Sequence, residues 1–318
     1  MLSIDPMWLF KIFESRTPFV GLGKMGTQLN LNTETVGGIR VAIPPADEIV
    51  SILRSINCET ARIDGLISRK TRFIELLREK RQALITHAVT KGLDPNAPMK
   101  DSGVAWLGDV PAHWRVLPLK WELLFLTSGS RGWADYYADD GALFIRIGNL
   151  TRDSTRLDLS DIQRVLVPRG AEGERTIVFS GDLLFSITAF LGSVAVVPSQ
   201  METAYVSQHV ALARLLGRVL NPEWVGYVAL SWVGKTHLES QGYGGTKVQL
   251  SLDDIANLIM IAPPMDEQLH IVDVLAQEME RIDTLIGTSE RSIELLKERR
   301  SALITAAVTG QIDLRETV

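Results

Sequence analysis

The sequence predicts an α/β (α+β) protein in which a globular domain lies between two long helices. An internal repeat and the spacing of the apolar residues carry this prediction. Residues 21–90 and 240–309, which lie 219 positions apart, match without a gap at 29 of 70 positions. Each copy runs from a glycine-rich turn through a Pro-Pro pair into a long helical pattern. Such a repeat predicts two equivalent structural units joined by a segment of another kind.

The first helix is predicted over residues 46–90. Pro44 and Pro45 end a strand-like segment, and Asp47 and Glu48 suit a first helical turn, because the N-terminus of a helix carries partial positive charge. A glycine and a proline shortly after the pattern favour its end there. The apolar positions have a spacing near 3.5 residues, as in a coiled-coil seam, at Ile49, Ile52, Leu53, Ile56, Ile63, Leu66, Ile67, Phe73, Ile74, Leu77, Leu84 and Ile85.

The second helix is predicted over residues 265–309, with Gly310 at its end. Residues 46–90 hold eight Lys/Arg and six Asp/Glu, a balance of +2, and residues 265–309 hold five and nine, a balance of −4. Opposite charges beside matching seams predict that the two helices pair as an antiparallel coiled coil. The alternative is two separately solvated helices with ordinary charge scatter. The second seam consists of Ile271, Leu275, Ile282, Leu285, Ile286, Ile293, Leu296 and Leu303.

Residues 96–262 have a different pattern, in which short β-rich runs alternate with turns that contain Gly and Asp. This alternation is typical of an α/β domain, here of about 170 residues. One helix is expected near residues 222–239, where Trp and Tyr on an apolar stripe indicate core packing rather than a cofactor site. The β-rich runs are residues 142–150, 175–187, 193–199 and 204–216.

Composition narrows the class of protein. Apolar residues make up 46% of the chain, charged residues 22%, and the net charge is −5, which predicts a globular protein and argues against a strongly basic nucleic-acid-binding surface. We expect the single cysteine, Cys58, to be partly buried in the first helix, and a single cysteine fits a reducing cytoplasm. No signal peptide and no membrane-spanning segment of about 20 apolar residues are predicted.

Motifs for catalysis, cofactors or metals are not found. Gly21, Gly23 and Gly26 match G-x-G-x-x-G, but the turn leads into a β-branched polar segment rather than into the helix that a dinucleotide site needs. Asn221-Pro222-Glu223 lacks the second proline of the Asn-Pro-Pro-aromatic motif of amino-methyltransferases. The sequence therefore predicts recognition rather than reaction. Five histidines lie scattered without the spacing of metal ligands, at His87, His113, His209, His237 and His270.

Taken together, these segments resemble the specificity subunit of type I restriction–modification enzymes. Residues 106–114 (WLGDVPAHW) resemble the opening of a target recognition domain, residues 245–250 and 261–268 resemble its close, and residues 281–309 resemble the conserved spacer helix. The resemblance implies a non-catalytic, cytoplasmic subunit that reads double-stranded DNA and holds no cofactor. It also implies partners: two modification subunits that methylate adenine with AdoMet, and restriction subunits that use ATP and Mg. By the same resemblance, the complex is expected to act as a type I site-specific deoxyribonuclease and adenine methyltransferase.

The resemblance also implies a domain layout, from which the chain departs at its N-terminal side. Compared with this layout, we expect that on the order of 100–150 residues of a first recognition domain are absent, judged by ordinary domain sizes. We expect a truncated product, a chain that works with a second specificity half-subunit, or two copies that form a homodimer and read a symmetric site. The layout is residues 1–45 as a C-terminal remnant of the first domain, 46–92 as the first spacer helix, 93–264 as a complete recognition domain, 265–310 as the second spacer helix and 311–318 as a tail.

DNA contacts are expected in the turn-rich segments of the complete domain. Residues 91–262 hold fifteen Lys/Arg and eighteen Asp/Glu, so we expect only a local basic face and weak DNA affinity for the chain alone. For single residues other roles stay open: Arg146 can pair with a nearby acid, and Asn149 can cap a turn. For the whole chain, a coiled-coil scaffold without a DNA role, or an inactive truncated subunit, is the alternative. The candidate contacts are Arg146, Asn149, Ser186, Thr188, Gln208, Tyr243, Thr246 and Lys247.

Overall fold

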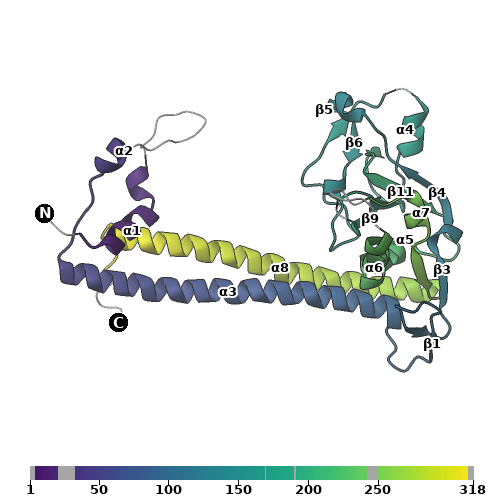
Figure 1. Cartoon of the computed structure of the whole chain (residues 1–318), viewed down its shortest axis with the longest axis horizontal. Coiled ribbons are helices and arrows are strands. Elements are labelled where there is room, and N and C mark those ends of the chain that lie inside the picture. The colour runs from purple at the N-terminus through teal and green to yellow at the C-terminus, as the bar shows by residue number, and fades with distance from the viewer. Residues whose placement is uncertain (1–3, 21–32, 169, 190, 242–248, 314–318) are drawn as a thin grey trace. The chain divides into compact units, whose positions relative to one another are not determined.

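The computed structural model describes residues 4–20, 33–168, 170–189, 191–241 and 249–313, which divide into two compact units (Figure 1). Unit 1 comprises residues 1–77 and 283–318, and unit 2 comprises residues 78–282. Two long helices, α3 (Ala46–Lys91) and α8 (Met265–Val308), contribute to both units. Long helices together with small sheets confirm the predicted α/β (α+β) fold class. None of the described helices is both long and apolar enough to cross a lipid bilayer.

The ends and the seams of α3 and α8 follow the sequence pattern closely. Both helices end at a glycine with positive φ, Gly92 at +74° and Gly310 at +70°, a left-handed conformation that favours glycine. Most predicted seam residues of α3 are buried, such as Ile56 and Ile63. Two predicted seam positions are wrong, because Phe73 and Leu285 are 44% and 46% exposed. Cys58 is also exposed rather than partly buried, since it lies on the helix face opposite Ile56.

Unit 1 joins the start of α3 to the end of α8. Its remaining helices are α1 (Pro6–Glu14), the 3₁₀ turn η1 (Thr17–Phe19) and α2 (Thr33–Gly37). Trp8 and Ile12 of α1 share one buried cluster with Ile52 and Ile56 of α3 and with Ile304 of α8. Early residues of α3 therefore meet late residues of α8, which confirms the antiparallel arrangement within this unit.

One ion pair between the two helices joins a cation of the acidic helix to a carboxylate of the basic helix. Arg300 of the acidic helix α8 donates from Nε to Asp64 of the basic helix α3, at 2.9 Å, and from Nη1 to Glu14 at 2.9 Å. Local geometry rather than helix net charge therefore decides this pair.

Unit 2 contains the β-structure. Among its described residues, two four-stranded sheets run in the orders β4-β11-β8-β9, which is antiparallel, and β10-β6-β7-β5, in which β10 and β6 are parallel. Two strand pairs, β1-β2 and β12-β3, complete the set. The strands are β1 (Met99–Asp101), β2 (Asp109–Pro111), β3 (Arg115–Pro118), β4 (Leu123–Ser128), β5 (Tyr137–Ala138), β6 (Ala142–Ile145), β7 (Arg164–Val165), β8 (Leu183–Ser186), β9 (Val194–Val196), β10 (Ala204–Val206), β11 (Val210–Leu215) and β12 (Ile259–Ala262).

The helix predicted over residues 222–239 is two helices, α5 (Pro222–Leu230) and α6 (Trp232–Gln241). The chain breaks at Ser231, which is extended at ψ 169° and accepts a hydrogen bond from Val233 N on its own Oγ. Gly234 lies so close to Ala229 that an added Cβ would stand 2.4 Å from its backbone, so the sharp corner requires glycine. The other helical elements of unit 2 are η2 (Leu119–Trp121), η3 (Trp133–Tyr136), η4 (Ile147–Asn149), α4 (Ala171–Thr176) and α7 (Leu252–Ala256).

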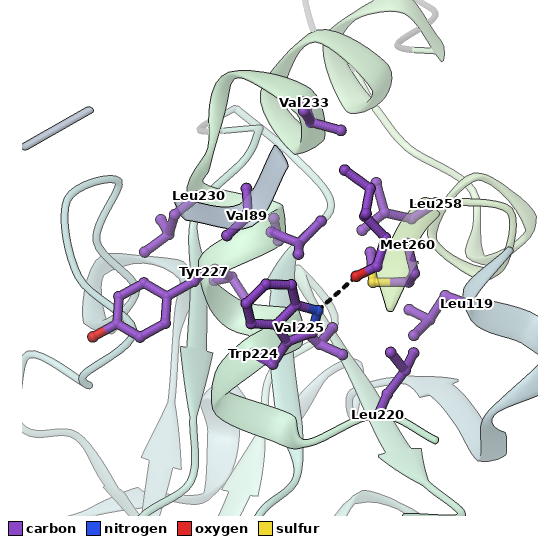
Figure 2. Packing of buried hydrophobic residues seen from close by; sticks show 14 of the residues in the cluster. Val89, Leu119, Leu220, Trp224, Val225, Tyr227, Leu230, Val233, Leu258 and Met260 are labelled. Carbon is purple, nitrogen blue, oxygen red and sulfur yellow. Dashed lines mark hydrogen bonds between the residues drawn. The ribbon is translucent and has the colours of Figure 1, made fainter. Parts of the chain in front are cut away.

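A tryptophan core joins the sheets of unit 2 to the helix pair. Trp224 of α5 is fully buried and donates from Nε1 to the carbonyl of Ile261 in β12 at 2.7 Å, as the dashed line in Figure 2 shows. Trp114 meets Trp224 edge to face, with ring centroids 5.8 Å apart. Val89 of α3 and Ile271 of α8 belong to the same cluster. Late residues of α3 therefore meet early residues of α8 here, and the helix ends form part of the domain core.

Candidate nucleic-acid interface

Four loops of unit 2 meet along one edge, which we call the loop edge: residues 129–131, 146–149, 187–189 and 207–209. Backbone hydrogen bonds connect the loop at residues 207–209 to each of the other three loops or to the residue just before it. Ser207 N donates to Ile145 O at 2.9 Å, Gln208 N to Ser130 O at 3.0 Å, and Ile187 N to His209 O at 3.1 Å. The loops follow β4, β6, β8 and β10, whose C-terminal ends the sheets bring to this edge. The loop edge is thus a continuous, hydrogen-bonded surface built from segments far apart in sequence.

Arg146 and Asn149 occupy one of these loops and form a local unit. The Asn149 side chain is 4% exposed, accepts from Arg146 N at 2.9 Å, and donates to the carbonyls of Asp158 and Asp161 at 2.8 and 3.0 Å. The Arg146 guanidinium donates to the carboxylate of Asp161 at 3.0 Å. Both alternative roles are therefore present: Asn149 caps the η4 turn and Arg146 pairs with an acid. Because every polar group of Asn149 is used internally, we treat it as a support for Arg146.

Ser186 and Thr188 shape the neighbouring loop from inside. Their residues are 1% and 6% exposed, and Ser186 Oγ donates to Thr188 O at 2.8 Å. The exposed residue that follows, Ala189, has φ +60°, a strained conformation for a residue with a Cβ. The Ser186 hydroxyl therefore holds the loop from inside, and Thr188 is buried rather than exposed.

Gln208 lies at the loop edge and is half-buried, with its Nε2 3.3 Å from Nε2 of His209. The other three predicted contacts, Tyr243, Thr246 and Lys247, lie outside the described residues. The next described residue after them, Gln249, forms a bridge with Thr188. The predicted contacts in the described part of the chain therefore gather at one edge, where Arg146 and Gln208 are the partly exposed members.

Arg131 of the loop edge and Tyr136 of η3 are two candidate DNA contacts that the sequence reasoning missed. Arg131 is exposed and directly follows Ser130, whose Oγ lies 2.7 Å from Thr176 Oγ1. Tyr136 is 44% exposed and lines the same small cavity as Arg131. A cation suits a phosphate or a guanine edge, and an aromatic ring suits stacking on a base. The signal in the sequence was an arginine followed by a glycine, Gly132, which has φ +76° in the structure.

Two basic residues elsewhere in unit 2, Arg214 and Arg164, are held in ion pairs. Arg214 donates to Asp182 from Nε and Nη2, both at 2.7 Å, and this hydrogen bonding raises the pKa of Arg214. Arg164 pairs with Glu202 at 2.7 Å, and its hydrogen bonds lower the pKa of that carboxyl. At the loop edge, Arg131 and Arg146 lie in loops that backbone hydrogen bonds hold together, which makes this edge a candidate for a local basic surface. Among the described residues no three His, Cys, Asp or Glu side chains are placed to hold a metal ion.

Comparison with solved structures assigns the fold. A chain from a structural study of the complex assembly and conformational transition of the type I R-M system superimposes with a TM-score of 0.74 at 16% identity, over 97% of this chain and 72% of that one. The HsdS subunit from Thermoanaerobacter tengcongensis superimposes with a TM-score of 0.52 at 18% identity, over 97% and 71%. The chain has the HsdS fold. This confirms the fold that the sequence resemblance implied, although no protein-family model matches the sequence.

Both superpositions extend over 97% of this chain. Asn221, Pro222 and Glu223, considered above against a methyltransferase motif, have a structural role in it. Asn221 is the N-cap of α5 and accepts from Trp224 N at 3.2 Å, and Pro222 occupies the first helical turn. The tripeptide is therefore a helix start in the HsdS fold.

Proposed function

We propose that this chain is the DNA-recognition subunit of a type I restriction–modification complex and has no catalytic activity of its own. The observation that carries the proposal is the superposition of 97% of this chain on a chain of the type I R-M system. Residues 93–264 act as the target recognition domain and read one half of a split DNA site. Residues 1–45 belong to the closing part of another recognition domain, residues 46–92 and 265–310 are the spacer helices, and residues 311–318 form a tail.

In this proposal the loop edge faces the DNA. Arg131 and Arg146 bind phosphates or the O6 and N7 atoms of guanine, and Gln208 is suited to adenine N6 and N7. Asn149 positions Arg146, because it holds the backbone N–H of that residue. The backbone hydrogen bonds between the loops fix the backbone that carries these side chains before DNA arrives, which lowers the ordering cost of binding. A net charge of −5 supports weak DNA affinity for the chain alone, with partner subunits supplying further phosphate contacts.

The long helices offer surfaces for two equivalent partners. Leu76 and Leu295 occupy equivalent positions of the repeat, 219 residues apart, and are 46% and 55% exposed. An exposed leucine in each copy suits a modification subunit docked on each helix. We propose that these subunits use AdoMet to methylate adenine, that restriction subunits use ATP and Mg, and that the complex works in the cytoplasm.

Charged substitutions at these leucines are expected to weaken the docking. In the Leu76→Glu, Leu295→Glu double variant, affinity for the modification subunit falls at least about tenfold, because a carboxylate must be buried in an apolar contact. Calorimetric titration with purified modification subunit measures the affinity and the stoichiometry. Leu166→Glu is the matched control, since Leu166 is 60% exposed in the recognition domain and away from the helices. Equal affinities for both variants would exclude this docking surface.

Removal of the carboxylate that pairs with Arg146 is expected to strengthen DNA binding. The Asp161 side chain is 87% exposed, so its ion pair is worth only about 0.2–1 kcal/mol. Asp161→Asn therefore raises the affinity of the complex for its DNA about two- to fivefold, because Arg146 no longer has to leave a carboxylate. Fluorescence anisotropy with a labelled duplex measures this change. Asp109→Asn, which removes the same charge from an exposed residue of β2, corrects for net charge; an equal gain there would contradict a specific role of Arg146.

Nuclease protection tests the proposed function as a whole. The chain, copurified with its modification subunit, is expected to protect a defined sequence within random DNA fragments, whereas the modification subunit alone protects none. A coiled-coil scaffold without a DNA role would leave the protection pattern unchanged when the chain is added. Incubation of the chain with AdoMet and DNA, without partners, is expected to transfer no methyl group.

A further inference from the structure

Two of the four loops of the loop edge, at residues 146–149 and 187–189, share a polar contact just after they end. We call them the two reading loops. The first is followed closely by Arg152, and the second is followed closely by Leu191. Arg152 Nη2 donates to Leu191 O at 2.8 Å and to the carboxylate of Glu239 in α6 at 2.9 Å. The segments that follow the two reading loops are therefore fastened to each other and to α6.

Lys235 of α6 connects this contact to the helix α3. Its ammonium group donates to Arg152 O at 3.2 Å and to Gln82 Oε1 of α3 at 2.7 Å. Its stem lies against the segment after the second reading loop, since a Cβ added to Gly192 would stand 3.2 Å from Lys235 Cγ. Gly192 has φ +82°, so this close turn favours glycine. One lysine thus contacts α3 and the backbone that follows each reading loop.

The helix α3 also holds the corner between α5 and α6. Gln82 Nε2 donates to the carbonyl of Leu230, the last residue of α5, at 3.1 Å. Thr86 Oγ1 accepts from the backbone N–H of Trp232, the first residue of α6, at 3.0 Å. Gln82 and Thr86 lie about one helical turn apart, so they present neighbouring polar groups to this corner. Gln82 therefore belongs both to the corner and to the Lys235 contact.

The Lys235 cation is half-buried, so the positions of its acceptors matter. Burial lowers the pKa of the Lys235 ammonium, and the charge of Arg152 lowers it further. Asp153 and Glu239 act in the opposite direction on this pKa. A second buried cation of α3, Arg81, is 7% exposed and donates from Nη1 to Asp153 O at 3.4 Å. Because a buried cation that loses an acceptor is destabilised, these contacts fix the segment after the first reading loop relative to α3.

We propose that Lys235 is a positioning residue, which fixes the two reading loops relative to α3 and so presents bound DNA to a modification subunit docked on that helix. This inference rests on the proposed function. Without the Lys235 contact the recognition domain shifts on α3, while the hydrogen bonds within the loop edge stay in place. DNA is then bound with the same sequence preference, but the target adenine is displaced from the methyltransferase centre. A misplacement of about 1 Å costs up to about a hundredfold in rate.

Methylation kinetics of the complex with the modification subunit test this role. Lys235→Met keeps the unbranched stem and removes the ammonium, so kcat is expected to fall at least about tenfold, whereas KM for DNA changes less than about threefold. Gln82→Leu removes the acceptor on α3 and is expected to have the same effect. The double variant is expected to lose no more than about twofold beyond either single variant, since both act on one contact. Lys120→Met, which breaks a surface hydrogen bond of 2.9 Å to Asn257 Oδ1, is the matched control and leaves kcat unchanged.

Amide hydrogen exchange of the chain without DNA provides a readout that is independent of methylation. In Lys235→Met, exchange is expected to become at least about fivefold faster at residues 151–154 and 191–193, because the contact that joins these segments to α3 is lost. Exchange within the buried strand β11, residues 210–215, is expected to stay unchanged.

Three results would overturn the positioning role of Lys235. The first is an unchanged kcat in Lys235→Met. The second is a raised KM with unchanged kcat, which would place Lys235 in DNA binding. The third is faster exchange in β11 as well, which would show a general loss of stability. A wild-type complex that methylates no DNA would contradict the proposed function, whereas an active wild-type complex with an equally active Lys235→Met variant would contradict the positioning role alone.

Discussion

Replacing Trp224 with alanine is expected to lower the free energy of unfolding of unit 2 by about 3–5 kcal/mol. Trp224 is fully buried, packs edge to face on Trp114 and donates to the carbonyl of Ile261. Its loss leaves a cavity at the junction of α5, β12 and the helix pair, and it leaves a buried carbonyl without its donor (Figure 2). Urea denaturation followed by circular dichroism measures the change.

Trp232, on the next helix, provides the matched control because it is 49% exposed. Trp232→Ala is expected to cost less than about 1 kcal/mol, since most of its surface stays in water. Equal losses for the two variants would contradict the assignment of Trp224 as the centre of the core.

The second large effect is expected at a buried ion pair. Asp182 has a side chain that is 1% exposed, receives two hydrogen bonds from Arg214 and accepts a third from Phe179 N at 2.8 Å. Asp182→Ala leaves the Arg214 cation beside the ring of Phe179 without its carboxylate and is expected to cost about 3–5 kcal/mol. Six of the seven tryptophans lie in unit 2, so the unfolding transition seen by tryptophan fluorescence reports on this unit.

Glu202 is the control for the buried pair. It pairs with Arg164 at the surface, with a side chain that is 49% exposed, and solvent screens the interaction. Glu202→Gln is therefore expected to shift the transition much less than Asp182→Ala. A shift of similar size in both variants would show that burial does not determine the strength of the Asp182 pair.

The helices were the most predictable part of the fold because their periodicity is local. The starts and ends of α3 and α8 follow from Pro-Pro pairs, acidic first turns and glycines that adopt positive φ. Phe73 and Leu285 deviated from the predicted seam, since a spacing of 3.5 residues identifies a stripe but not the width of the contact. The corner at Ser231 could not be predicted from an apolar stripe, because the turn depends on a close approach between Gly234 and Ala229.

The candidate site was predictable only in part, because the sheets decide which loops become neighbours. Arg146 and Gln208 were identified from residue type and their turn-rich surroundings, and the sheet order brings them to one edge. Ser186 and Thr188 were identified by the same reasoning, but burial gives them an internal role. Arg131 was missed since its position beside Gln208 depends on a bridge between Ser130 and Ser207, 77 residues apart.

Mapping methylated adenines tests the central claim most directly. DNA treated with AdoMet, the modification subunit and this chain is expected to carry N-methyladenine at one defined sequence. DNA treated without the chain is expected to carry none above background. An Arg131→Ala, Arg146→Ala, Gln208→Ala triple variant that still binds the modification subunit is expected to lose that sequence preference. Methylation of the same sequence by the triple variant, or by the modification subunit alone, would contradict the account that the loop edge of this chain selects the DNA.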